Sequence, residues 1–219
     1  IQEGISPDRI IKTGSPMKEV IQANMESIKG SKILEELSLE KNKYFLVSIH
    51  REENVDSKKN FENLIRSLDI IAETYKYPII VSTHPRTRKK MEAQGYENKN
   101  KLIVYSKPYG FHDYNKLQMN SFCTVSDSGT IAEESSIFGI PAITIRQAHE
   151  RPEGMDEGTL VMSGLDSNDI INAISVVTAS GKKHQIVKDY DVDNVSLKVL
   201  RVILSYYHYI NRETWKKFS

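Results

Sequence analysis

Short apolar runs alternate with amphipathic segments along most of the chain. Six of these runs are rich in β-branched and aromatic residues and nearly free of charge, which is typical of strands buried on both faces of a parallel sheet. The segments between them repeat apolar residues at three- and four-residue steps, the spacing of a helix with one buried face. We therefore predict strands over residues 44–49, 79–83, 102–106, 122–126, 141–145 and 160–162.

Helices are predicted between these strands. The clearest begins at Asp56, a candidate N-cap, shows helical spacing from Phe61 to Tyr75, and ends before Pro78. Further helices are predicted over residues 111–120, 130–138, 167–179 and from about 195 to 210, with a polar connection over 181–194. Strands and helices in this order predict an α/β domain with a doubly wound, Rossmann-like parallel sheet, because crossovers between parallel strands are right-handed.

Composition limits the classes of partner. The chain has 219 residues, of which 39% are hydrophobic and 27% charged, enough for a globular core without disulfides. Its net charge of +1 provides no overall field for nucleic acid, and no apolar stretch approaches the length of a membrane span. The single cysteine, Cys123, lies in an apolar run, so we expect a buried, inert thiol of the kind found in a reducing cytoplasm.

Polar residues follow four of the predicted strands. Doubly wound sheets bind ligands beyond the carboxyl ends of their strands, so these positions are candidates for a site. Any one group could be explained by packing or by a surface turn, but the sheet would bring all four to one crevice. The groups are SIHREENVD with His50, Arg51, Glu52 and Glu53; STHPRTR with His84; SDSGT; and IRQAHERPEG with Arg146, Glu150, Arg151 and Glu153.

The segment SDSGTIAEES has the features of a phosphate site. Gly129 would let a ligand approach the backbone, and the first amides of the following helix, together with its dipole, favour an anion. Thr130 and Glu133 also match a capping box, which would explain both without a ligand. The capping box does not explain Glu134. Phosphates would repel a carboxylate close to them, so the natural partner of Glu134 is a ribose diol. The pattern therefore indicates a nucleotide sugar.

Two aromatic residues precede the fourth strand in KPYGFHDYNKL. Phe111 and Tyr114 could each flank a nucleotide base. For Phe111 we expect packing of the helix onto the sheet instead.

Taken together, these motifs resemble one enzyme family. HREEN (50–54), STHPR (82–86), SDSGTIAEES (126–135) and ERPEGMDEGT (150–159) are similar to motifs of the non-hydrolysing UDP-N-acetylglucosamine 2-epimerases. The resemblance covers this whole chain but only the C-terminal part of the family, which implies one half of a GT-B-type enzyme with two Rossmann-like domains. The implied organisation is an interdomain segment (1–17), a UDP-binding domain (18–194), and a C-terminal helix and tail (195–219) that pack towards the N-terminal domain.

The resemblance also implies roles for individual residues. His50 corresponds to the family's catalytic histidine, Glu134 to its ribose-binding glutamate, and Tyr114 to the aromatic beside the uracil. The diphosphate ligands would be His84, Ser128, Gly129, Thr130 and Arg146. Further candidate substrate or regulatory contacts are Arg51, Glu53, Glu150 and Arg151. We expect neither a metal nor a cofactor.

In this family, UDP is eliminated from the sugar to leave a glycal. Re-addition then takes place on the other face of the glycal. The family's acid–base carboxylates belong to the N-terminal domain, so the chain alone is expected to bind UDP weakly and not to turn over. Glu52 replaces a second arginine and Thr130 a second glycine. These departures make the chain most similar to the branch that forms UDP-N-acetyl-L-fucosamine from UDP-2-acetamido-2,6-dideoxy-L-talose in bacterial capsule or O-antigen synthesis.

Three alternatives remain open at this point. They are a UDP-GlcNAc 2-epimerase making UDP-ManNAc, the donor domain of a GT-B glycosyltransferase, and a non-catalytic nucleotide-sugar sensor. Under the favoured reading, the complete protein is a cytoplasmic homodimer that binds a UDP-sugar and neither nucleic acid nor membrane.

Overall fold

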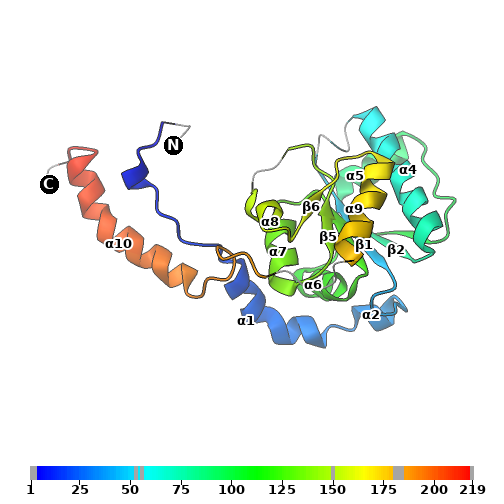
Figure 1. The fold of residues 1–219 in the computed structure, drawn as a ribbon, viewed down its shortest axis with the longest axis horizontal. Helices are drawn as coiled ribbons and strands as arrows, with labels where there is room; N and C mark the ends of the chain where they lie inside the picture. The colour runs from blue at the N-terminus through cyan, green and yellow to red at the C-terminus, as the bar shows by residue number, and fades with distance from the viewer. Residues whose placement is uncertain (1–3, 52–53, 55–56, 149–150, 180–184, 218–219) are drawn as a thin grey trace. The chain divides into compact units, whose positions relative to one another are not determined.

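The computed structural model describes residues 4–51, 54, 57–148, 151–179 and 185–217 (Figure 1). The chain divides into two compact units. One unit is Asn24–Val187, and the other combines Ile1–Ala23 with Lys188–Ser219.

The larger unit is built on a six-stranded sheet in which all paired strands are parallel, in the order β3-β2-β1-β4-β5-β6. This confirms the predicted doubly wound α/β sheet, and each strand boundary lies within a residue of its prediction. The order reverses between β1 and β4, so a crevice is expected beyond their carboxyl ends. The strands are β1 (Phe45–Ile49), β2 (Ile79–Thr83), β3 (Ile103–Ser106), β4 (Cys123–Ser126), β5 (Ala142–Thr144) and β6 (Val161–Met162).

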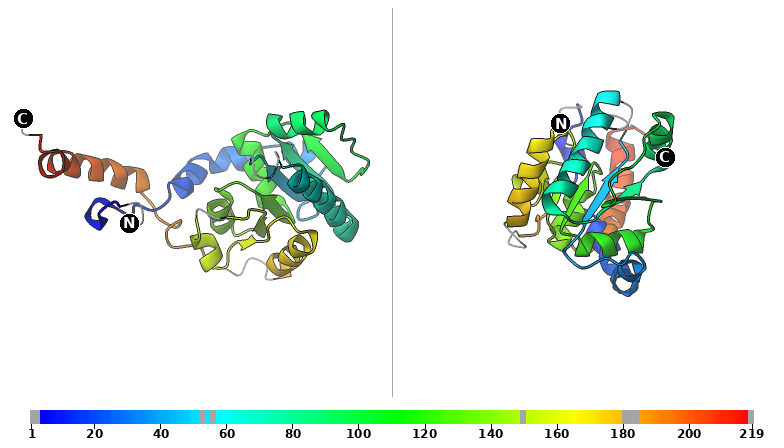
Figure 2. Two further views of the ribbon diagram at one scale, coloured as in Figure 1. Left: turned by 90° about the horizontal axis from the view of Figure 1, so that it is seen from above. Right: turned by 90° about the vertical axis from the view of Figure 1, so that its right-hand side faces the viewer.

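Helices cover both faces of this sheet. α4 and α9 pack against each other over one face, and α2 and α6 pack together over the other, as Figure 2 illustrates for α4 and α9. The helices of this unit are α2 (Ile33–Glu36), α4 (Lys58–Tyr75), α5 (Pro85–Ala93), α6 (Phe111–Asn120), α7 (Ile131–Phe138), α8 (Glu153–Asp156) and α9 (Ser167–Ala179). α1 (Met17–Gly30), which was not predicted, begins in the smaller unit.

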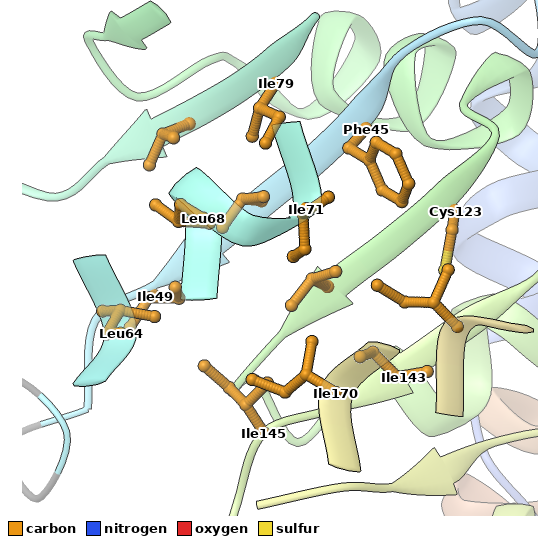
Figure 3. Close-up of a cluster of buried hydrophobic side chains, with 14 of the residues drawn as sticks. Phe45, Ile49, Leu64, Leu68, Ile71, Ile79, Cys123, Ile143, Ile145 and Ile170 are labelled. Atoms are coloured by element: carbon orange, nitrogen blue, oxygen red, sulfur yellow. The ribbon is translucent and has the colours of Figure 1, made fainter. Parts of the chain in front are cut away.

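The core follows from the two-residue period of the strands. Phe45, Val47 and Ile49 of β1 face the helices α4 and α9, where they pack with Leu68 and Ile71 (Figure 3). Tyr44 and Leu46 point the other way, towards α2 and α6. Both faces of β1 are therefore buried, which explains why its sequence is apolar throughout rather than alternating.

Local signals set the ends of the helices. Ser57 caps α4 by accepting a hydrogen bond from the Asn60 amide at 3.3 Å. The predicted cap, Asp56, lies outside the described residues. α7 ends at Gly139, whose φ of 62° is left-handed and favours glycine.

The smaller unit contains η1 (Pro7–Arg9), the first turns of α1, and α10 (Val195–Glu213). Lys18 pairs with Asp191 and Asp193, each at 2.8 Å, and the Ser15 amide donates to the Asp189 carbonyl at 2.9 Å. α10 has a band of exposed apolar side chains: Leu197, Leu200, Ile203, Leu204 and Tyr207. None of the helices in the described part of the chain combines the length and hydropathy needed to cross a membrane.

Candidate functional site

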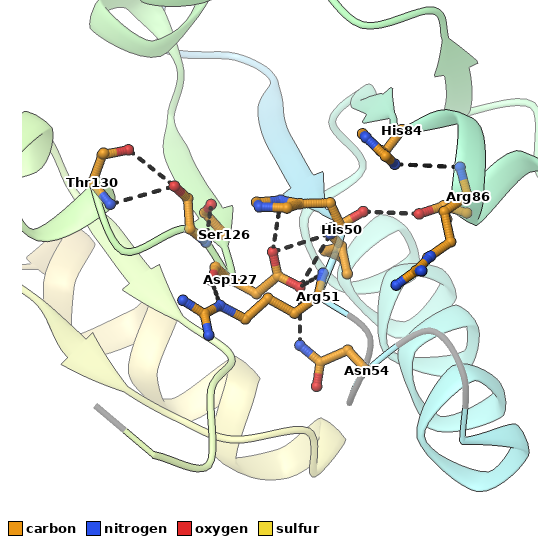
Figure 4. A network of polar contacts seen from close by, with 11 residues as sticks. His50, Arg51, Asn54, His84, Arg86, Ser126, Asp127 and Thr130 are labelled. Atoms are coloured by element: carbon orange, nitrogen blue, oxygen red, sulfur yellow. Dashed lines mark hydrogen bonds and ion pairs between the residues drawn. The ribbon is translucent and has the colours of Figure 1, made fainter. Parts of the chain in front are cut away.

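A buried carboxylate lies at the point where the strand order reverses. Asp127 follows β4 directly and has an exposed fraction of 0%. It accepts hydrogen bonds from the His50 and Arg51 amides at 3.1 and 2.9 Å, and from Asn54 Nδ2 at 3.0 Å. Figure 4 shows these groups, which follow β1, converging on Asp127. The carboxylate therefore joins the ends of the two central strands.

His50 forms an ion pair with the same carboxylate. Its Nδ1 lies 3.1 Å from Asp127 Oδ1, and its side chain is 43% exposed. The hydrogen bond to Asp127 raises the pKa of His50, although partial burial and the nearby Arg51 oppose the shift. Burial acts to raise the pKa of Asp127, but its hydrogen bonds with His50, Arg51 and Asn54 together lower it below its usual value. The pair is thus arranged to hold an anionic Asp127 beside an imidazole that readily takes up a proton.

Two further groups surround His50. Arg51 donates from Nε to the Asp127 carbonyl at 3.0 Å, so its guanidinium is anchored at the end of β4. The His84 ring centre lies 6.1 Å from that of His50. His84 caps α5, and its Nδ1 accepts from the Arg86 amide at 3.3 Å. The two predicted histidines are therefore neighbours.

The predicted phosphate loop adjoins this pair. Ser128 and Thr130 share a hydrogen bond between their hydroxyls at 2.9 Å, and the Ser128 amide donates to Ser126 Oγ at 3.1 Å. Thr130 has no side-chain hydrogen bond to a helix amide, so the capping box, which was the alternative explanation for Thr130 and Glu133, is not formed. The Glu133 carboxylate instead forms an ion pair with Arg151.

Within the described residues, no acceptor is recorded for the amides of Gly129, Ile131 and Ala132. These amides lie at the start of α7, where helix geometry leaves N–H groups without intrahelical partners. A pocket with an interior volume of about 20 Å³, room for roughly one water molecule, adjoins them. Its lining includes Ser128, Gly129, Thr144, Arg146 and Arg151.

Glu134 lies beneath this loop with an exposed fraction of 8%. Its Oε2 accepts a hydrogen bond from Gln118 Nε2 at 2.9 Å. Burial raises the pKa of Glu134 above its usual value, while hydrogen bonds with Gln118 and Thr130 act against the rise. A buried carboxylate of this kind can accept a hydrogen bond from a ligand hydroxyl.

Tyr114 lies on α6 beside the same carboxylate. Burial raises the pKa of its hydroxyl, the nearby Glu134 adds to the rise, and a hydrogen bond with Ser48 opposes it. Phe111, one turn earlier, is 41% exposed and lies edge-on to His112. The expectation that Phe111 packs α6 onto the sheet is therefore wrong, because Tyr114 and Leu117 of the helix have that role.

The structure thus brings together His50, Arg51, His84 and the 128–130 loop, with Glu134 and Tyr114 below them. Glu53 and Glu150 lie outside the described residues, as do Glu52 and His149. Cys123 is buried as predicted, and burial raises the pKa of its thiol. No group of three or more His, Cys, Asp or Glu side chains that could hold a metal occurs among the described residues.

Three residues of the site were not among the predicted site residues: Asn54, Gln118 and Asp127. Asp127 could have been found from its place directly after a buried strand. Asn54 ends the HREEN motif, but its role as a donor to Asp127, 73 residues away, has no local signal, and neither has the bond from Gln118 to Glu134, 16 residues away.

Comparison with known proteins agrees with this arrangement. The family model described as UDP-N-acetylglucosamine 2-epimerase matches residues 1–204. A UDP-N-acetylglucosamine 2-epimerase of Methanococcus maripaludis is 33% identical over 188 residues, covering 83% of this chain and 51% of the relative. The chain therefore spans about half the length of that relative.

Solved structures show the same fold. The UDP-N-acetylglucosamine 2-epimerase of Rickettsia bellii superposes with a TM-score of 0.88 at 43% identity, covering 99% of this chain and 58% of that one. The Methanocaldococcus jannaschii enzyme, in complex with UDP-GlcNAc and UDP, gives a TM-score of 0.85 at 26% identity, with coverages of 93% and 57%. The chain belongs to the UDP-N-acetylglucosamine 2-epimerase family.

Proposed function

We propose that this chain is the nucleotide-binding part of a UDP-sugar 2-epimerase. The observation that carries the proposal is the meeting of two distant motifs, in which His50 Nδ1 lies 3.1 Å from the carboxylate that precedes the Ser128–Thr130 loop. A histidine that can carry a proton then adjoins a helix start suited to a diphosphate. The complex of the Methanocaldococcus jannaschii relative with UDP-GlcNAc and UDP supports this class of ligand.

In this proposal the diphosphate binds at the loop between β4 and α7. The amides of Gly129, Ile131 and Ala132 would donate to it, and the α7 dipole would favour its charge. Arg146 lines the adjacent pocket and adds positive charge, and His84 lies beside His50.

The nucleoside would extend towards α6. Glu134 would accept a hydrogen bond from a ribose hydroxyl, and Tyr114 would lie near the uracil. The proximity of Glu134 to the Tyr114 hydroxyl supports one continuous nucleoside site.

The reaction would be elimination followed by re-addition. A base removes the proton from C2 of the sugar, the C1–O bond breaks, and its electron pair leaves with the diphosphate. Return of UDP to C1 and of a proton to the other face of C2 completes the change. Donors held in advance around the departing diphosphate stabilise the charge that develops on it. The base would come from residues of the whole protein beyond this chain, as the resemblance implies, so the chain alone would not turn over.

For the sugar, we propose UDP-2-acetamido-2,6-dideoxy-L-talose, converted to UDP-N-acetyl-L-fucosamine by a cytoplasmic homodimer in bacterial polysaccharide synthesis. The proposal rests on the departures at Glu52 and Thr130. The Thr130 hydroxyl, absent from a glycine, bonds Ser128 within the loop and so alters the diphosphate site. The exposed apolar band of α10 would pack towards the second domain of the whole enzyme.

Calorimetry with UDP on this chain tests the nucleotide site. Replacing Ser128 and Glu134 together by alanine should weaken binding about tenfold or more, because charge-assisted hydrogen bonds are lost. The matched control is Ser175→Ala with Glu73→Ala, which changes the same residue types at exposed positions on α9 and α4. Unchanged affinity in the Ser128 and Glu134 variant would refute the assignment.

Substrate choice is tested on the whole protein that contains this chain. It is offered each nucleotide sugar separately, and epimerisation at C2 is followed by proton NMR. We expect turnover of the talose derivative. Turnover of UDP-GlcNAc alone would instead support the UDP-ManNAc alternative, and UDP release only with a sugar acceptor would support a glycosyltransferase.

A further inference from the structure

We propose that Asp127 is a positioning residue for His50, holding the imidazole with its proton on Nδ1 and presenting Nε2 to the nucleotide site. This inference rests on the proposed function for its place in the reaction. The contact between Asp127 and His50 involves residues of this chain alone, so the tautomer and pKa of His50 can be measured without enzymatic turnover.

The first step of the argument is the direction of each hydrogen bond. An ionised carboxylate can only accept, so a nitrogen at hydrogen-bond distance from it must carry a hydrogen. Asp127 Oδ1 lies 3.1 Å from His50 Nδ1 and also accepts from the His50 amide at 3.1 Å. The neutral imidazole therefore has its hydrogen on Nδ1, and Nε2 remains as the acceptor. When His50 is protonated, Nε2 is the donor.

The second step is that hydrogen bonds hold the Asp127 carboxylate in one orientation. Its Oδ2 accepts from the His50 amide, the Arg51 amide and Asn54 Nδ2, at 3.1, 2.9 and 3.0 Å. Asn54 and Asp127 are both buried, so the carboxylate cannot rotate away from His50 without leaving donors without an acceptor. The carboxylate of Asp127, held in place by these donors, thus fixes the orientation of the His50 imidazole.

Several charged or titratable side chains of the described residues lie close to Asp127 and His50. His50 and Arg51 face Asp127 from the end of β1, and the Tyr114 hydroxyl lies near it from α6. His84 approaches His50 from the start of α5, with 6.1 Å between ring centres. The cations adjoin the carboxylate and the phenol is neutral at ordinary pH, so Asp127 remains anionic over the range in which His50 titrates.

The third step concerns the neighbouring loop. Asp127 directly precedes Ser128, and its carbonyl accepts from Arg51 Nε at 3.0 Å. The residue that orients His50 is therefore continuous with the loop that would hold the diphosphate. A histidine placed in this way could give a proton to, or share one with, the oxygen of the departing diphosphate.

A purely structural role, in which Asp127 only caps the end of β1, is the competing explanation. It predicts a change in stability but no particular protonation state of His50. The two explanations therefore differ in the tautomer and pKa of one imidazole.

The test is nitrogen-15 NMR of the histidines in this chain, titrated between about pH 5 and 9 around the ordinary histidine pKa. The His50 signals are assigned by their loss in His50→Gln. In the unaltered chain we expect the tautomer protonated at Nδ1 and a pKa above the ordinary value. Finding the hydrogen on Nε2 overturns the proposal, and this measurement requires no variant at Asp127.

Asp127→Asn is the diagnostic variant, because an asparagine side chain has one acceptor and one donor where the carboxylate has two acceptors. We expect the pKa of His50 to fall by about one unit, corresponding to a tenfold change in proton affinity. Asn54→Ala is the control, since it removes one donor and leaves the carboxylate beside His50. An unchanged His50 pKa in Asp127→Asn, or an equal fall in both variants, contradicts the proposal.

Two further measurements keep this inference separate from the proposed function. Ser128→Ala should weaken UDP binding but leave the His50 pKa as it is. In the whole protein, Asp127→Asn should lower kcat by about tenfold or more, with a smaller change in KM, and shift the pH profile with the His50 pKa. Absence of UDP binding with the expected His50 tautomer would refute the function alone. UDP binding with an unperturbed His50 would refute the role of Asp127 alone.

Discussion

Removal of the Asp127 carboxylate should destabilise the sheet by a predictable amount. In Asp127→Ala, the half-exposed His50 Nδ1 can turn to water, but three further donors lose their acceptor: the His50 amide, the Arg51 amide and Asn54 Nδ2. A buried donor left without a partner costs about 1–3 kcal/mol. Because His50 is 43% exposed, water can reach part of the space, so we take the lower end of that range. The expected loss is about 3 kcal/mol for the three donors.

The assay is thermal unfolding followed by far-ultraviolet circular dichroism. For a chain of this size each 1 kcal/mol lowers Tm by about 2–4 °C, so Asp127→Ala should melt about 6–12 °C below the unaltered chain. Tryptophan fluorescence is not the right probe, because the single tryptophan, Trp215, follows α10 in the smaller unit and is 66% exposed.

Asn54→Ala serves as the matched control because it removes one of the three donors and leaves the carboxylate in place. It should lower Tm by only about 3–6 °C, as expected for one hydrogen bond to a charged group at the lower end of its range, about 1.5 kcal/mol. Equal decreases in the two variants, or a decrease of less than about 2 °C in Asp127→Ala, would show that the carboxylate does not organise these donors.

Four further outcomes are expected. Cys123 should resist alkylation until the chain unfolds, because the thiol is buried and burial raises its pKa; rapid modification of the folded chain would contradict this. Ile71→Ala should destabilise the chain by about 2–5 kcal/mol in urea titrations, since it opens a cavity between α4 and the sheet, whereas a loss below about 1 kcal/mol would place this side chain outside the core. The lowered pKa of Asp127 should stabilise the chain above about pH 4, and this stability is lost as pH falls through the folded pKa of Asp127. The raised pKa of His50 should stabilise the chain below about pH 6.5, and this stability is lost as pH rises through the folded pKa of His50. Urea midpoints measured against pH should lose the first dependence in Asp127→Ala and the second in His50→Gln. Leu204→Glu should leave the Tm of this chain unchanged, because Leu204 is 67% exposed, yet weaken assembly of the whole protein in analytical ultracentrifugation.

Much of the fold could be predicted because central parallel strands are marked in the sequence by uninterrupted apolar runs. β1, β2 and β4 are buried on both faces, so their runs are continuously apolar and their ends are sharp. α1 was missed although Ser15 and Pro16 precede it, and the Ser15 hydroxyl accepts from the Met17 amide at 3.1 Å. Both residues fall in the interdomain segment (1–17) that the family resemblance implies, and that resemblance does not predict a helix start there.

The candidate site was predictable where its residues follow strands and unpredictable where they meet across the fold. His50, His84 and Ser128 each follow a strand, and the sheet order then makes them neighbours. The choice between a capping box and an ion pair for Glu133 depended on Arg151, 18 residues further along the chain. Phe111 and Tyr114 differ by three positions on one helix, and only packing decided which of them is enclosed.

The sequence by itself therefore determined the α/β class, the six strands, and the strand ends at which polar residues gather, because periodicity and burial are local properties of a chain. Tertiary structure alone decided that Asp127 would accept hydrogen bonds from His50, Arg51 and Asn54, and that Gln118 would hold Glu134. Hydrogen bonds of this kind require atoms from distant segments to lie within about 3 Å of one another, and only the register and order of the assembled sheet bring them that close.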